Sequence, residues 1–121
     1  MSHPDAISTF GNCELARERP QLFTAAVGEY CAVVQLAVEE SVAGTDRHTL
    51  AKVRSLARRL GDADSLPQDV IAIHLSALAM LVRNKPHGMA KACVRHSRLL
   101  LVKMVGELAL FYREQARAGV R

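Results

Sequence analysis

The sequence predicts an all-α fold, namely a four-helix up-down bundle with a long C-terminal helix. First, apolar residues recur at three- and four-residue steps over long stretches, which is the period of an amphipathic helix. Second, helix-forming residues dominate, and the 121 residues include only three Phe, two Tyr and no Trp. Third, no segment shows the two-residue alternation of a strand. One domain is expected, because a chain of this length that is 50% apolar can form one core.

The first segment, residues 1–19, is predicted to be a tail with one short helical turn, because it lacks apolar periodicity. Asn12 can cap that turn, which would begin at Cys13. The helical bundle is predicted to span residues 20–121 and to act as an interaction domain.

The first long helix is predicted from Pro20 to Val42. Proline is tolerated in a first helical turn, and Ala43-Gly44 can end the helix. Glu39 and Glu40 lie off its apolar stripe. The stripe itself consists of Phe23, Val27, Tyr30, Val34, Val38 and Val42.

Thr45 or Asp46 can cap the second helix, which is predicted to run to Leu60. Gly61 suits a left-handed cap directly after its last turn. The predicted buried face contains Leu50, Val53, Ala57 and Leu60.

The third helix is predicted to begin near Ser65 and to continue to Arg83, since Ser65 and Gln68 have the spacing of a capping box. A helix that is apolar nearly all round has to be buried on more than one side. The sequence therefore predicts either a central helix or one that a second subunit covers. Its apolar residues are Val70, Ile71, Ile73, Leu75, Leu78, Met80, Leu81 and Val82.

The fourth helix is predicted from Met89 to Ala118, and it would be about 45 Å long. A helix of this length would protrude from a four-helix domain, and an exposed apolar end would favour a partner chain. Its main stripe contains Met89, Cys93, Leu100, Met104, Leu108 and Phe111.

Charge is distributed unevenly along the chain. Residues 1–69 contain ten acids and seven bases, whereas residues 70–106 contain six bases and no acid. This stretch can be a solvated helix face, or it can face nucleic acid or an acidic protein surface. The anion-facing candidates lie on roughly one face of the fourth helix; they are Lys91, Arg95 and Arg98, with Arg113 further along. No aromatic residues are interleaved for base stacking, so nucleic-acid binding is the alternative hypothesis.

No catalytic constellation is predicted. His74 stands in an apolar run, and no acid, thiol or second histidine lies within four positions to orient it. We therefore prefer a buried, hydrogen-bonded histidine over a general base. Cys93 and His96 could share a metal ion, but a zinc site needs two further ligands that the sequence does not offer at the usual spacing. The sequence predicts no enzyme activity, no metal and no cofactor.

The compartment is predicted to be the cytoplasm. Cys13, Cys31 and Cys93 do not form a disulfide framework, and the N-terminus lacks the pattern of a signal peptide. Charge or histidine interrupts the apolar stretches within about ten residues, which is too short to span a bilayer. No membrane association is therefore expected.

Two segments carry a resemblance to known families. Leu66–Leu78, with its Ile73-His74 step after a proline, resembles the N-terminal, kinase-recruiting domain of RsbU-type phosphoserine phosphatases. It is also similar to the C-terminal helical domain of the circadian clock protein KaiA. In the fourth helix the likeness rests on Leu101-Val102, Val105 and Phe111-Tyr112-Arg113. The resemblance covers roughly residues 20–116.

The resemblance implies a non-catalytic signalling adaptor that forms a homodimer and binds a switch kinase or a kinase tail. It implies docking at Val102 and Gly106, beside Leu101 and Val105. The family prefers a bulky aliphatic residue at both docking positions, and glycine inside a helix costs about 1 kcal/mol relative to alanine. Gly106 thus indicates either a close approach or a changed docking surface. The residues expected in the dimer interface or the core are Ile73, His74, Met104, Leu108 and Phe111.

Overall fold

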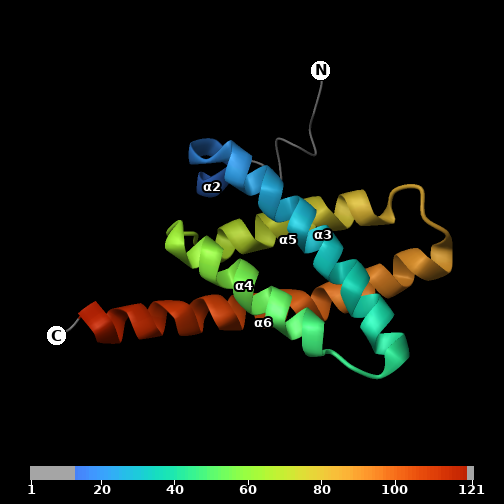
Figure 1. The fold of residues 1–121 in the computed structure, drawn as a ribbon. Coiled ribbons are helices and arrows are strands. Elements are labelled where there is room, and N and C mark those ends of the chain that lie inside the picture. The colour runs from blue at the N-terminus through green and yellow to red at the C-terminus, as the bar shows by residue number, and fades with distance from the viewer. Residues whose placement is uncertain (1–12, 120–121) are drawn as a thin grey trace, which may run out of the picture.

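The protein is all-α, as predicted. The computed structural model describes residues 13–119, of which 88% lie in helices and none in strands. In chain order the helices are α2 (Glu14–Glu18), α3 (Pro20–Ala43), α4 (Arg47–Asp62), α5 (Pro67–Val82) and α6 (His87–Gly119). The chain reverses direction between successive long helices, so α3 and α4 form one antiparallel hairpin and α5 and α6 form another (Figure 1).

The two hairpins cross obliquely, with α3 and α6 packed against each other at the crossing (Figure 1). α3 contacts every other described helix, whereas α6 contacts α3, α4 and α5. Within the described chain α4 and α5 do not contact each other.

One hydrophobic core joins all five helices. Leu15 of α2 lies in this core, so the predicted boundary at residue 19 does not separate the short first helix from the packing of the bundle. Val42, the last member of the predicted α3 stripe, is 87% exposed because the end of α3 extends beyond the core. The most deeply buried side chains of the long helices include Tyr30, Val34, Leu60, Ile73, Met104 and Leu108.

Glu40 joins the end of α3 to the start of α4. Its Oε1 accepts hydrogen bonds from the backbone N–H and the hydroxyl of Thr49 at 2.8 and 2.7 Å. Its Oε2 accepts one from the His48 backbone N–H at 3.2 Å and lies 2.7 Å from Nδ1 of the same residue. The first turn of a helix has free N–H groups, so a carboxylate there is favourable. Asp46 is the N-cap residue, but its side chain makes no cap hydrogen bond.

The start of α5 is held by Asp69 rather than by the predicted pair of Ser65 and Gln68. Oδ2 of Asp69 accepts from the Leu66 N–H at 2.6 Å, and Oδ1 accepts from the Leu15 N–H at 3.1 Å. The second hydrogen bond ties α2 to α5. The predicted capping box is therefore wrong, because the N-cap position falls on Leu66, which has no side-chain acceptor.

Gly61 lies inside α4, which continues to Asp62. A Cβ at Gly61 would overlap the ring of Phe111, so the missing side chain permits the close approach of α4 and α6. The left-handed backbone conformation occurs instead at Asp64, with φ 59°. The prediction that Gly61 caps the second helix is wrong, because a contact 50 residues away in the chain selects glycine here.

The C-terminal turns of α6 project past the other helices (Figure 1). The 33 residues of α6 correspond to about 50 Å of helix. Residues 113–119 are all exposed and mostly polar. The projecting end is thus not the exposed apolar end that the sequence predicts.

α3 is long and apolar enough to cross a membrane by length and composition alone, contrary to the expectation from the sequence. The core helix of a soluble protein passes the same test. In this fold α3 contacts all other described helices and buries Ala26, Tyr30 and Val34. Packing in the core accounts for part of its apolar composition, because 33% of its most apolar 18-residue window is buried.

Candidate interaction surfaces

α6 presents an exposed face opposite to its buried stripe. Met104 and Leu108 are 1% exposed and point into the core. On the opposite side of α6, Val102 is 71% exposed, which is far more than Met104 or Leu108 of the buried stripe. Side chains at these spacings share one side of a helix. We call the exposed set Leu99, Val102, Gly106 and Leu110 the α6 face.

The structure divides the four predicted docking residues into two pairs. Val102 and Gly106 belong to the α6 face, whereas Leu101 and Val105 are half-buried and pack against the core. A Cβ at Gly106 would meet no atom within 4 Å. No close approach within the described chain therefore accounts for this glycine.

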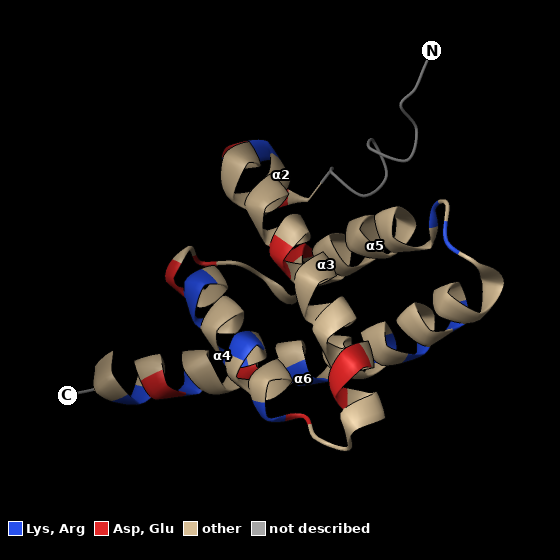
Figure 2. Cartoon of the chain, turned by 45° about the vertical axis from the view of Figure 1, so that its right-hand side comes forward, with Lys and Arg blue, Asp and Glu red and all other residues tan. Residues whose placement is uncertain are grey.

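Basic residues occur along α6 both before and after its middle (Figure 2). The predicted bases Lys91, Arg95 and Arg98 are exposed on the N-terminal side of Leu99. Arg113 and Arg117 are exposed beyond Leu110. None of these five bases forms an ion pair with a described residue. Arg117 was not predicted, although its helical spacing from Gly106 could have revealed it.

The charged residues between these two groups are turned toward α4. Lys103 lies 4.0 Å from the carboxylate of Asp46, and Glu107 lies 3.6 Å from the guanidinium of Arg54. The middle of the α6 face is consequently apolar. Its N-terminal end carries three bases, and its C-terminal end carries two bases and the exposed Glu114.

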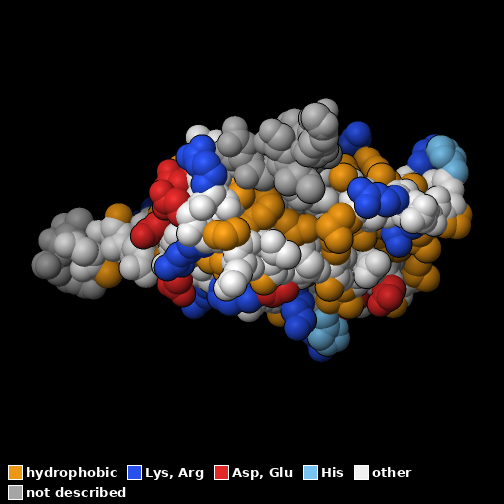
Figure 3. Space-filling model, turned by 90° about the horizontal axis from the view of Figure 1, so that it is seen from above, with side chains coloured by type: hydrophobic (Ala, Val, Ile, Leu, Met, Phe, Trp, Pro, Cys, Tyr) orange, Lys and Arg blue, Asp and Glu red, His pale blue; other side chains and the backbone are white. Residues whose placement is uncertain are grey.

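A second apolar stripe is exposed on α5. Ile71, Leu75 and Val82 are 43%, 38% and 36% exposed, and Leu78 between them is half-buried. The only ionisable residues of α5 are Asp69 and His74, and both are buried. The exposed side of α5 therefore carries no charge, and hydrophobic side chains form a band on the face seen in Figure 3.

The sequence predicted that the third helix is either central in the fold or covered by a second subunit, and the exposure of the α5 stripe tests the first of these. A central helix covered on all sides by the same chain is excluded within the described residues. Cover by a second subunit stays a prediction.

The five residues predicted for the dimer interface or the core lie inside the described chain. Ile73, His74, Met104 and Leu108 are at most 6% exposed. Phe111 is half-buried and packs against Gly61.

His74 belongs to a hydrogen-bonded group at the centre of the fold. The Tyr30 hydroxyl donates to the Ser97 carbonyl at 3.2 Å, and its oxygen lies 2.8 Å from His74 Nδ1. Since the hydroxyl has one proton, Nδ1–H of His74 is the donor to Tyr30. Desolvation by burial lowers the pKa of His74, which favours the neutral ring. No described carboxylate is hydrogen-bonded to His74.

The cysteines and the other described histidines do not cluster into a metal site. All three cysteines are free, and Cys93 is buried in the core. Across residues 13–119 no three His, Cys, Asp or Glu side chains are placed to hold a metal ion.

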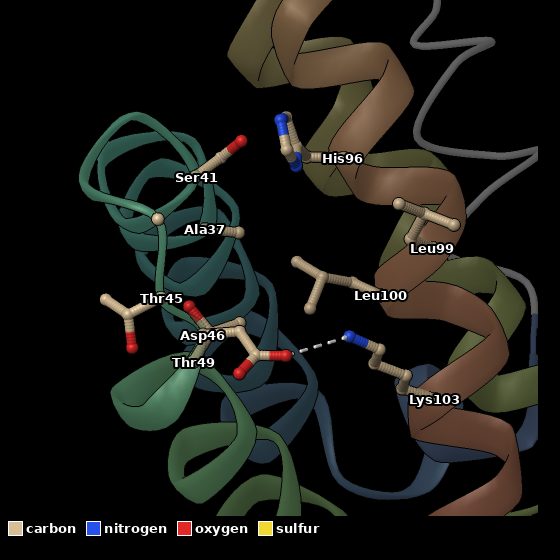
Figure 4. Close-up of a pocket in the computed structure, with 10 residues that line it drawn as sticks. Ala37, Ser41, Thr45, Asp46, Thr49, His96, Leu99, Leu100 and Lys103 are labelled. Carbon is tan, nitrogen blue, oxygen red and sulfur yellow. Dashed lines mark ion pairs between the residues drawn. The ribbon is translucent and has the colours of Figure 1, made fainter.

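A hollow of about 450 Å³ lies between the end of α3, the start of α4 and the middle of α6 (Figure 4). Lys103 and Asp46 point toward each other across it and form the ion pair described above. Leu99 and Leu100 supply apolar lining. Because Leu99 also belongs to the α6 face, the hollow continues this face toward α3 and α4.

The sequence matches no known protein family and no curated protein, and the structure matches no solved structure.

Proposed function

We propose that this chain is a non-catalytic adaptor domain that dimerises and binds a second protein in a phosphorylation-based signalling pathway of the cytoplasm. The observation that carries the proposal is the exposure of apolar side chains on two separate helices, α5 and α6. Contiguous exposed apolar side chains are typical of surfaces that bind other proteins. In this proposal the four long helices of the two hairpins form a four-helix up-down bundle.

The α5 stripe is assigned to the dimer. Ile71, Leu75, Leu78 and Val82 follow a four-three-four spacing, which is the seam pattern of paired helices. In a two-fold dimer the same surface meets itself, so a charged face would bring like charges together. The α5 stripe has no charge and avoids this cost.

The α6 face is assigned to the protein partner. Val102 and Gly106, the docking positions implied by the family resemblance, both lie on it and are exposed. That resemblance makes a switch kinase or a kinase tail the proposed partner. A surface separate from the α5 stripe lets one dimer bind two partner molecules.

The test of dimerisation is the solution mass by light scattering over a concentration series. We expect twice 13.2 kDa for the unchanged chain. Leu75→Glu should give the monomer mass, because it would bury an unpaired carboxylate in the apolar interface. Ala51→Glu, at an exposed position of α4, is the matched control and should remain dimeric. A monomer mass for the unchanged chain at all concentrations would refute the dimer.

Nucleic-acid binding is the second candidate, and it is favoured by the five bases on α6 that have no ion pair within residues 13–119. Binding to phosphates would weaken steeply as the salt concentration rises. It would depend on Arg95 and Arg98 but not on Val102. Gel-shift titrations of mixed-sequence DNA and RNA at two salt concentrations measure this directly.

A further inference from the structure

We infer that the α6 face binds an acidic amphipathic segment of another protein, with apolar residues in its middle and carboxylates at both ends. This inference rests on the proposed protein-binding function of α6 and specifies its partner by chemistry.

The first argument is the order of side chains along the exposed side of α6. Leu99, Val102 and Leu110 expose 56%, 71% and 47% of their surface in the middle. Arg95 and Arg117 lie beyond them on either side, and neither has an ion pair among the described residues. A complementary surface needs apolar groups opposite the middle and negative groups opposite the ends.

The second argument is that charge disfavours a second copy of this chain on the α6 face. If two α6 helices paired antiparallel about Gly106, Arg95 would lie opposite Arg117, since each is eleven residues from Gly106. Parallel pairing would place every base opposite its own copy. The antiparallel pairing would also bring Glu114 opposite Arg98, since each is eight residues from Gly106. Like charges therefore disfavour the parallel arrangement throughout and the antiparallel one at Arg95 and Arg117.

The third argument favours a protein over a polyphosphate. Phosphate groups would satisfy the bases, but they would leave Leu99, Val102 and Leu110 without apolar contacts. A helical segment can cover both. Gly106 adds room for it, because a side chain is missing where the exposed apolar residues meet. The hollow beside Leu99 can accept a bulky apolar side chain.

The test is a selection from a yeast-displayed library of helical segments about 25 residues long, the length that spans Lys91 to Arg117. The library is random in charge and in apolar content. The readout is the mean net charge of the enriched segments relative to the unselected library. We expect the unchanged protein to enrich segments that are acidic at both ends and apolar in the middle.

Two variants separate the contributions of charge and apolar contact. With Arg95→Glu/Arg117→Glu, the enriched segments should shift toward basic ends, and segments selected by the unchanged protein should bind about tenfold more weakly or worse. With Val102→Asp, binding of those segments should be lost. Glu14→Gln, an exposed change on α2, is the control and should alter neither result. Circular dichroism checks that each variant is folded.

Enrichment of neutral or basic segments, or no enrichment at all, would overturn the inference. Tight binding to DNA or to phosphatidylserine vesicles that Val102→Asp leaves unchanged would also overturn it, in favour of a phosphate surface. Enriched segments that lack acids but still depend on Val102 would contradict the inference while leaving the proposed protein-binding function intact. The dimer is tested independently, through Leu75 and the solution mass.

Discussion

The Tyr30 hydroxyl oxygen lies 2.8 Å from His74 Nδ1 and 3.2 Å from the Ser97 carbonyl oxygen, so one side chain of α3 hydrogen-bonds to both α5 and α6. All three residues are at most 6% exposed. A buried polar group that loses its partner is costly, because no water replaces the bond. This group therefore holds the two hairpins in one relative position.

Tyr30→Phe should lower the free energy of unfolding by about 1–3 kcal/mol, because it removes both hydrogen bonds of the hydroxyl and leaves the buried His74 Nδ1 unpaired. Urea unfolding measures this change. His74→Leu should cost less in the Tyr30→Phe background than alone, since the pair acts as a unit. Strictly additive costs would contradict the hydrogen bond between them.

Glu40 should make stability fall in acid. Desolvation by burial would raise the pKa of Glu40, but the hydrogen bonds from Thr49 and His48 outweigh it and lower the pKa from 4.5 to about 2. Because the folded pKa lies below the unfolded one, this contribution is present above pH 4.5 and is lost as the pH falls toward 2. Glu40→Gln should be less stable than the unchanged chain at pH 7, and the difference should shrink by pH 2.5. Thermal unfolding at both pH values would show a constant difference if this assignment were wrong.

Gly61→Ala should lower the free energy of unfolding by about 1–3 kcal/mol, because the added methyl group overlaps the Phe111 ring. Phe111→Leu removes part of the ring, so the same alanine should cost less in that background. A double-mutant cycle from urea unfolding measures the coupling. If Gly61→Ala were stabilising, α4 and α6 would not approach closely at this position.

Gly106→Ala should raise the free energy of unfolding of the isolated chain by up to about 1 kcal/mol, because alanine is the better helix former and the site is open. Gly28→Ala is the matched control, since Gly28 also lies in a helix with nothing near its missing side chain. The two changes should have similar effects on thermal unfolding. Only Gly106→Ala should weaken binding of segments selected on the α6 face, and equal effects of both changes on binding would remove Gly106 from that face.

The positions of the long helices were predictable from local information. The α3 stripe through Val27, Tyr30 and Val34 is buried as its spacing predicts, and the fourth helix was placed within two residues of its start and one of its end. Helix ends that depend on distant residues were not predictable. Glu40 lies off its stripe, yet it is buried because the start of another helix supplies its hydrogen bonds.

The candidate surfaces were likewise predictable in part from local sequence and in part only from the packing of the helices. Helical spacing placed Lys91, Arg95 and Arg98 on roughly one face of the fourth helix, and the family resemblance implied docking at Val102. The apolar composition of the third helix indicated a need for cover. Spacing did not show that Leu101 and Val105 turn toward the core while Leu99 and Leu110 stay exposed. That depends on which side of α6 the other helices occupy.

The sequence by itself determined the helical class, the approximate helix ranges and the acid-free stretch of residues 70–106, since each depends on residues within a few turns of one another. Tertiary structure decided that Gly61 is a packing glycine, that Glu40 and Asp69 hold helix starts, and that α5 and α6 keep exposed faces. These features depend on residues that are distant in the chain and meet only when the hairpins cross. Burial and hydrogen bonding are properties of that crossing, so no local pattern encodes them.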